Sequence, residues 1–112
     1  MLESDFNEAE RNLVCKISGR MDVKNSEELE EALNKHLLEV LPVSLENGSF
    51  NGNSIEIVFD LSGVDYVSSL FIRLCSATAQ RDGIKSFAIV NSNARVKKIF
   101  KIAGLDEMLN LS

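Results

Sequence analysis

Length, composition and charge exclude several classes of protein. The chain has 112 residues, enough for one compact α/β domain and too few for two, and its 45% hydrophobic and 26% charged residues are typical of a globular rather than a disordered or collagen-like protein. The net charge of -5 and the pI near 4.8 argue against nucleic acid or an anionic membrane as partner, because phosphate binding requires a basic surface.

Targeting signals and cysteines point to an intracellular setting. The sequence contains no apolar run of membrane-spanning length, and its acidic start, Met1 to Asp5, lacks the positive charge of a secretory signal. We therefore expect a cytoplasmic protein without membrane insertion. Cys15 and Cys75 both lie in apolar patterns, which predicts buried thiols rather than a disulfide.

The first predicted element is a strand over 12–17, where alternate residues are apolar and Ser18-Gly19 ends the strand. An amphipathic helix follows, with Ser26 as its expected N-cap, apolar side chains every three or four residues, and an end before Pro42. Residues 42–54 are dense in Gly, Asn and Ser, which predicts a long exposed loop.

The next predicted elements are a strand and a helix. Residues 55–61 (IEIVFDL) are apolar and β-branched enough for the middle strand of a sheet, buried on both faces and ended by Ser62-Gly63. A second helix is expected from Ser68 or Ser69 to about Arg81, with Phe71, Leu74, Cys75 and Thr78 as its apolar stripe.

A third strand and a third helix complete the order. The strand covers 85–91, and Asn93 caps the helix, which ends just before Gly104. Residues 105–109 are expected to add one helical turn. Strands that alternate with helices predict an α/β sheet covered by helices, with parallel pairing wherever a helix makes the crossover.

The segment 60–69 (DLSGVDYVSS) carries the strongest functional signal. It joins the predicted middle strand to the second helix, and partner sites of α/β folds gather at such strand ends. Together with 19–22 (GRMD), 94–100 (ARVKKIF) and 103–105 (AGL), it resembles the STAS family of anti-sigma factor antagonists. The resemblance spans most of the chain. It implies a single STAS domain over 1–112, with a central mixed sheet of about four or five strands and three or four helices.

By position, the resemblance places Ser69 on the serine that a partner kinase phosphorylates in the family, and Ser68 on the residue before it, often an aspartate. Leu70-Phe71 stands where many members have a small residue and a glycine, which predicts a more crowded approach to Ser69. Without the resemblance, N-capping of the helix explains either serine. With it, we assign the regulatory role to Ser69 and the cap to Ser68.

The resemblance also implies a partner-binding face. Its expected members are Gly19, Arg20, Asp22, Asp65, Tyr66, Ser68, Ser69 and Arg73. The predicted function is an anti-sigma factor antagonist that binds a serine-kinase anti-sigma factor and is switched off by phosphorylation of Ser69. The alternative is an unphosphorylated scaffold subunit of a stress-signalling assembly or an ABC transporter. A weak homodimer is a further alternative for the partner.

Enzymatic chemistry finds little support. Asp22, Asp60 and Asp65 follow no metal-ligand spacing, so we assign them turn, cap and contact roles. His36 is the sole histidine and is predicted to be a solvated helix residue. A small hydrolase or nucleotide-binding enzyme would need a base beside a nucleophile or a phosphate-binding glycine loop, and neither appears. We therefore expect no catalytic residue, no metal and no cofactor.

Overall fold

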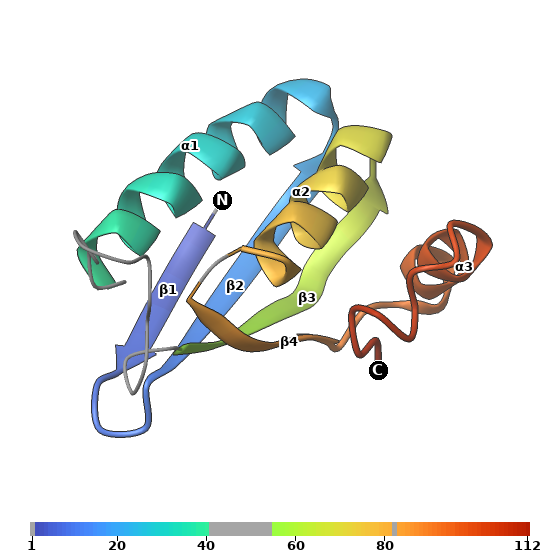
Figure 1. Cartoon of the computed structure of the whole chain (residues 1–112). Coiled ribbons are helices and arrows are strands. Elements are labelled where there is room, and N and C mark those ends of the chain that lie inside the picture. The colour runs from blue at the N-terminus through green and yellow to red at the C-terminus, as the bar shows by residue number, and fades with distance from the viewer. Residues whose placement is uncertain (1, 41–54, 82) are drawn as a thin grey trace.

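The computed structural model describes residues 2–40, 55–81 and 83–112, which form one four-stranded sheet and three helices (Figure 1). The elements in chain order are β1 (Leu2–Asn7), β2 (Asn12–Met21), α1 (Val23–Val40), β3 (Ile55–Val67), α2 (Ser69–Ala79), β4 (Ile84–Val90) and α3 (Ala94–Ile102). The predicted α/β fold is confirmed. The predicted loop over 42–54 lies outside the described residues.

The sheet is mixed, with strand order β1-β2-β3-β4. β2, β3 and β4 are parallel to one another, whereas β1 is antiparallel to β2. Sequence analysis missed β1 because the segment LESDFN has few apolar residues. Its Leu2 and Phe6 pair with Ile17 and Leu13 and pack against the core, so tertiary contact rather than strand propensity explains this strand.

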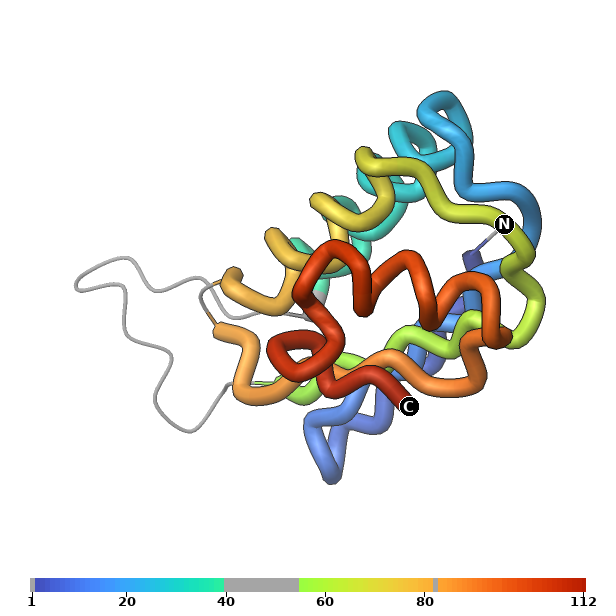
Figure 2. Tube along the Cα trace, turned by 90° about the vertical axis from the view of Figure 1, so that its right-hand side faces the viewer, coloured from blue at the N-terminus to red at the C-terminus, as the bar shows by residue number. Residues whose placement is uncertain are grey.

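The hydrophobic core lies on one face of the sheet. Buried side chains alternate along β2 and β3 and join buried residues of α1, α2 and α3 in one cluster. The described helices lie over this face of the sheet (Figures 1 and 2). The buried stripe of α2 is the predicted one, Phe71, Leu74, Cys75 and Thr78. The prediction that the middle strand is buried on both faces is wrong. Glu56, Val58 and Asp60 are only half-buried, because the helices of the described chain all pack on the opposite face.

Both cysteines are buried free thiols, as predicted. Burial disfavours the thiolate and raises the pKa of Cys15 to about 12, and it raises the pKa of Cys75 as well.

Two predicted strand ends are wrong. β2 continues past Ser18-Gly19 to Met21, and β3 continues past Ser62-Gly63 to Val67, with the two extensions paired to each other. Gly19 has φ of 101° and lies next to one of two register shifts, at which the extra residue, Asp65, belongs to β3. The glycine therefore continues β2 opposite a bulge in β3 instead of ending the strand. Gly63 pairs with Ser18, whose Cβ lies only 2.8 Å from where a Cβ on Gly63 would stand.

The C-terminal part follows its prediction closely. Asn93 is the N-cap of α3 and accepts a hydrogen bond of 2.8 Å from the Val96 N–H. Beyond α3, one hydrogen bond of a helical turn joins the Leu109 N–H to the Leu105 carbonyl, after which Leu111 forms a parallel bridge with Ile89 of β4. Within the described ranges, no helix has both the length and the apolar character needed to cross a membrane.

The close approach of β2 to β3 generates the first prediction. Gly63→Ala places a methyl group against the Ser18 Cβ and 3.3 Å from its Cα, so the strands must separate. We expect a loss of about 1–3 kcal/mol in the free energy of unfolding, measured by urea titration.

Ser18→Gly removes the nearer contact and should restore part of this loss. Gly104→Ala is the control, because Gly104 has φ of +75° with open space around it, so an alanine there strains only the backbone. The loss of stability caused by Gly104→Ala should be the same with and without Ser18→Gly. Equal stability of Gly63→Ala and wild type would show that the strands do not need this glycine.

Candidate functional site

The candidate site lies where two strands extend beyond the rest of the sheet. The pairing of β1 with β2 reaches Ile17, and that of β4 with β3 reaches Asp60. Residues 18–21 of β2 and 62–67 of β3 therefore form a two-stranded extension, here called the ribbon. The ribbon leads directly into α1 and α2, so the two helices begin next to each other (Figure 1).

The start of α1 differs from its prediction. Ser26 is not the N-cap, because the helix begins three residues earlier at Val23. Asp22 has this role instead, since its Oδ1 accepts a hydrogen bond of 2.9 Å from the Asn25 N–H. Gly19 to Met21, which were expected to follow the end of the first predicted strand, lie in β2.

Ser26 instead joins the two helix starts. The Met21 carbonyl accepts hydrogen bonds from the Ser68 N–H at 2.8 Å and from the Ser26 hydroxyl at 3.3 Å. The Ser26 and Ser68 hydroxyl oxygens lie 3.3 Å apart. This distance allows a hydrogen bond between the two hydroxyls. We call this buried group of Met21, Ser26 and Ser68 the serine joint.

The serine joint also distinguishes Ser68, which has a structural role, from Ser69. Ser68 is the N-cap of α2, as predicted, and its Oγ accepts a hydrogen bond of 3.2 Å from the Phe71 N–H. Ser69 is the first residue of α2 and is exposed. Of the two bulky residues after it, Phe71 is fully buried in the core and Leu70 is half-buried.

The predicted residues Arg20 and Tyr66 are brought together across the ribbon. They are paired in register, and the Arg20 guanidinium lies 4.0 Å from the centre of the Tyr66 ring, within cation–π range. The Asn25 side chain donates a hydrogen bond of 2.7 Å to the Arg20 carbonyl and fixes the backbone below the stack. Asn25 was missed from the sequence; the signal that could have found it is Asp22, a favoured N-cap residue that places Asn25 in the first turn of the helix.

The remaining predicted residues surround this pair. Gly19 is paired with Val64 in the ribbon, and Asp65 is exposed on the neighbouring strand. Arg73 is exposed one turn after Ser69, a spacing that puts both on the same side of α2. The site thus presents an exposed hydroxyl among charges of both signs, an arrangement suited to binding another protein.

Asp60 stands at the base of the ribbon. Its Oδ1 accepts a hydrogen bond of 3.0 Å from the Ser62 N–H, which stabilises the carboxylate and lowers the pKa of Asp60. Across the described residues, no group of three or more His, Cys, Asp and Glu side chains is arranged to hold a metal ion. His36 is half-buried rather than fully solvated, with Nε2 3.4 Å from the Ser4 Oγ.

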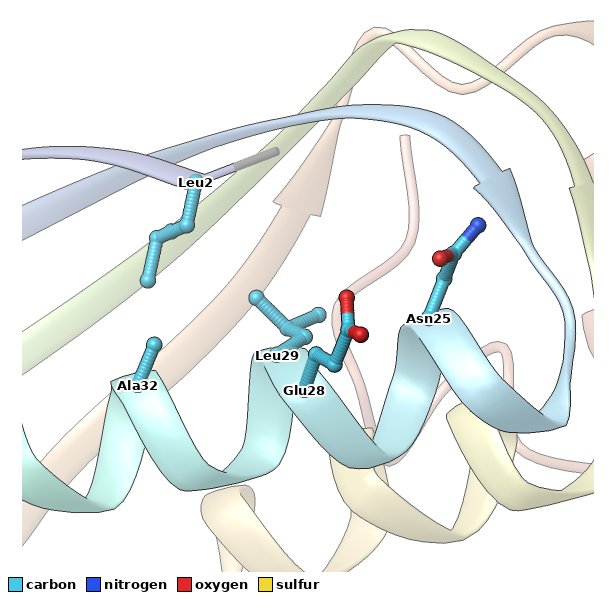
Figure 3. Close-up of a pocket in the computed structure, with 5 residues that line it drawn as sticks. All are labelled: Leu2, Asn25, Glu28, Leu29 and Ala32. Carbon is cyan, nitrogen blue, oxygen red and sulfur yellow. The ribbon is translucent and has the colours of Figure 1, made fainter.

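A small pocket lies between the start of β1 and α1 (Figure 3), and it shares Asn25 with the end of the ribbon. Its volume is about 170 Å³, and its lining residues are Leu2, Asn25, Glu28, Leu29 and Ala32. Among these, Glu28 is the one ionisable side chain, so the lining contains no nucleophile paired with a base.

Comparison with known proteins gives one family and several similar folds. The family model described as STAS domain matches residues 3–112. No curated protein matches the sequence. An anti-sigma factor antagonist from Mycobacterium paratuberculosis superposes with a TM-score of 0.72 at 20% identity, over 99% of this chain and 85% of that one. The unphosphorylated form of the anti-sigma factor antagonist SpoIIAA superposes with a TM-score of 0.60 at 10% sequence identity, over 91% of this chain and 83% of that one. The phosphorylated form of SpoIIAA, from Bacillus, superposes with a TM-score of 0.52 at 14% sequence identity, over 100% of this chain and 91% of that one.

The different roles of the two serines predict different effects on stability. Ser68→Ala removes the cap of α2 and one hydroxyl of the serine joint, so we expect a loss of about 1–2 kcal/mol in the free energy of unfolding. Ser69→Ala, the matched control, should change it by less than about 0.5 kcal/mol. Urea unfolding followed by circular dichroism measures both. Equal losses would contradict the assignment of the cap to Ser68.

The lowered pKa of Asp60 should make the stability of the protein depend on pH. Its pKa is lower in the folded than in the unfolded chain, so ionised Asp60 stabilises the fold above its unfolded pKa of about 3.9, and this contribution disappears as the pH falls through the folded pKa. Asp60→Asn keeps an acceptor for Ser62 but does not titrate. Urea titrations should show the two proteins differing most near neutral pH and converging in acid. A difference that does not change with pH would refute this role.

Proposed function

Because this chain belongs to the STAS domain family, we propose that it is an anti-sigma factor antagonist that binds a serine-kinase anti-sigma factor and is released when Ser69 is phosphorylated. The observation that carries the proposal is the difference between two adjacent serines. Ser68 is buried and caps α2, whereas Ser69 is exposed at the start of the same helix. The exposed serine is available to a kinase, and the buried one holds the site in shape.

The proposed docking face consists of the ribbon and the first turns of both helices. Arg20 stacked on Tyr66 gives it a rigid centre, and arginine and tyrosine are enriched among residues that dominate binding energy. Val23 is 55% exposed at the start of α1 and adds apolar area beside Asp22. We expect the kinase to cover this face together with Ser69.

Phosphorylation would act on the interface and leave the fold intact. The kinase transfers the γ-phosphoryl group of ATP to the Ser69 Oγ, so that a P–O bond forms, ADP leaves and the hydroxyl proton passes to a base of the kinase. The first backbone N–H groups of α2 and the positive end of its dipole tolerate the new charge. In a dry interface, however, a charge of about -1.5 to -2 costs desolvation and repels acidic groups such as Asp22 and Asp65.

Two structural neighbours support this proposal. The Mycobacterium paratuberculosis protein is itself an anti-sigma factor antagonist, and SpoIIAA adopts this fold in both its phosphorylated and its unphosphorylated form. The half-buried Leu70 beside Ser69 favours a second candidate. This is a scaffold subunit of a stress-signalling assembly or an ABC transporter, whose partner covers Ser69 without modifying it.

Binding measurements with Ser69 variants test the switch. Capture from native extract, with mass spectrometry of the bound chains, identifies the partner, and titration calorimetry with the purified partner measures affinity. We expect wild type and Ser69→Ala to bind an ATP-binding kinase, and Ser69→Asp to bind at least about tenfold more weakly. The purified kinase should label wild type and Ser68→Ala with phosphate from ATP, but not Ser69→Ala.

Ser86→Asp is the matched control, because it adds the same charge to an exposed serine on β4. It should bind the kinase as well as wild type does. If wild type and Ser69→Asp retain the same STAS or transporter subunits with equal affinity, the switch is refuted and the scaffold function replaces it.

A further inference from the structure

The sheet has a second face that the helices of the described residues leave open. Side chains on this face follow the register across the strands, so that Val14 of β2, Val58 of β3 and Ala88 of β4 stand in one row, with Val90 next to Ala88 along β4. All four are half-buried, and none belongs to the hydrophobic core of the described residues. We call Val14, Val58 and Ala88 the open-face row, whereas Val90 pairs with Asp60 and lies in the adjacent row.

The row is unusual for its type of sheet. It runs across β2, β3 and β4, which are parallel, and parallel strands are normally covered on both faces. The described helices pack against the opposite face (Figures 1 and 2). An apolar row on uncovered parallel strands is the kind of surface that a further layer of structure completes.

Charge around the row is mainly negative. Asp5 of β1 extends the row at one end, and Glu56 lies beside it on β3. The adjacent row contains Glu3, Lys16 and Asp60, paired across three strands. Lys16 is thus the one cation among these register positions and already lies between two carboxylates. A partner with apolar side chains flanked by cations would complement this surface.

A hollow marks one end of the surface. It has a volume of about 310 Å³ and is lined by Glu3, Ser4, Asp5, Val14 and Lys16. Two carboxylates beside one valine suit the long side chain of a lysine or arginine, whose stem is apolar and whose end is charged.

We propose that the open-face row and its acidic rim form a second binding surface, which takes a basic amphipathic helix of a partner protein. The apolar side of that helix covers Val14, Val58 and Ala88, and its lysines or arginines face Glu3, Asp5 and Glu56. The surface lies on the sheet rather than at the helix starts, so it goes beyond the function proposed for Ser69 and does not depend on it.

A labelled synthetic helix tests the proposal. The probe has about five turns with leucine on one side and lysine along both flanks, and fluorescence anisotropy measures its binding. We expect Val58→Lys to weaken binding at least about tenfold, and Val58→Thr, which keeps the shape of the side chain, to weaken it about two- to fivefold. Binding should weaken between about 50 and 300 mM salt, and a probe with glutamate in place of lysine should not bind.

Two controls separate this surface from the site at Ser69. Val23→Lys alters an exposed valine on α1, and Ser69→Asp alters the proposed switch, and neither should change the affinity of the probe. Circular dichroism confirms that each variant is folded.

Equal affinity of wild type, Val58→Lys and Val58→Thr for the probe would overturn the proposal. So would sedimentation showing a dimer of wild type that Val58→Lys disrupts, because a second copy of the chain would then occupy this face.

Discussion

The carbonyl of Met21 is the group on which the rest of the site depends. It accepts hydrogen bonds from the backbone of Ser68 and the hydroxyl of Ser26, and so joins the end of β2 to the starts of both helices. These groups are buried, where an unpaired polar atom costs about 1–3 kcal/mol. The joint therefore fixes where α2 begins, and with it the position of Ser69.

This arrangement separates stability from regulation within two residues. Ser68 uses its hydroxyl inside the protein, on the Phe71 N–H and on Ser26, whereas Ser69 presents its hydroxyl to solvent beside the ribbon. A phosphate on Ser69 therefore lies at the surface, where it contacts the partner and not the hydrophobic core. The same logic applies to Arg20, whose backbone is held by Asn25 while its side chain lies on Tyr66 at the surface.

Much of the fold could be predicted from sequence because local patterns and tertiary contacts agree there. The stripe of α2, the cap at Asn93 and the cap at Ser68 are examples. Prediction failed where long-range contacts decide the outcome. Gly19 and Gly63 are ordinary strand breakers in sequence, yet both lie inside paired strands, Gly19 opposite a bulge in β3 and Gly63 in close contact with β2. Serine is a common N-cap residue, and only the contact of Ser26 with Ser68 in the folded chain reveals a different role for it.

A phosphate on Ser69 should change the surface without breaking the hydrogen bonds of the serine joint. Amide hydrogen exchange measured by NMR, on protein phosphorylated at Ser69 and on unmodified protein, tests this most directly. The amides of Ser68 and Phe71, which donate to Met21 and to the Ser68 hydroxyl, should keep the same protection in both forms. A marked loss of protection at these two amides on phosphorylation would show that the phosphate acts by unfolding the start of α2, and would contradict the account.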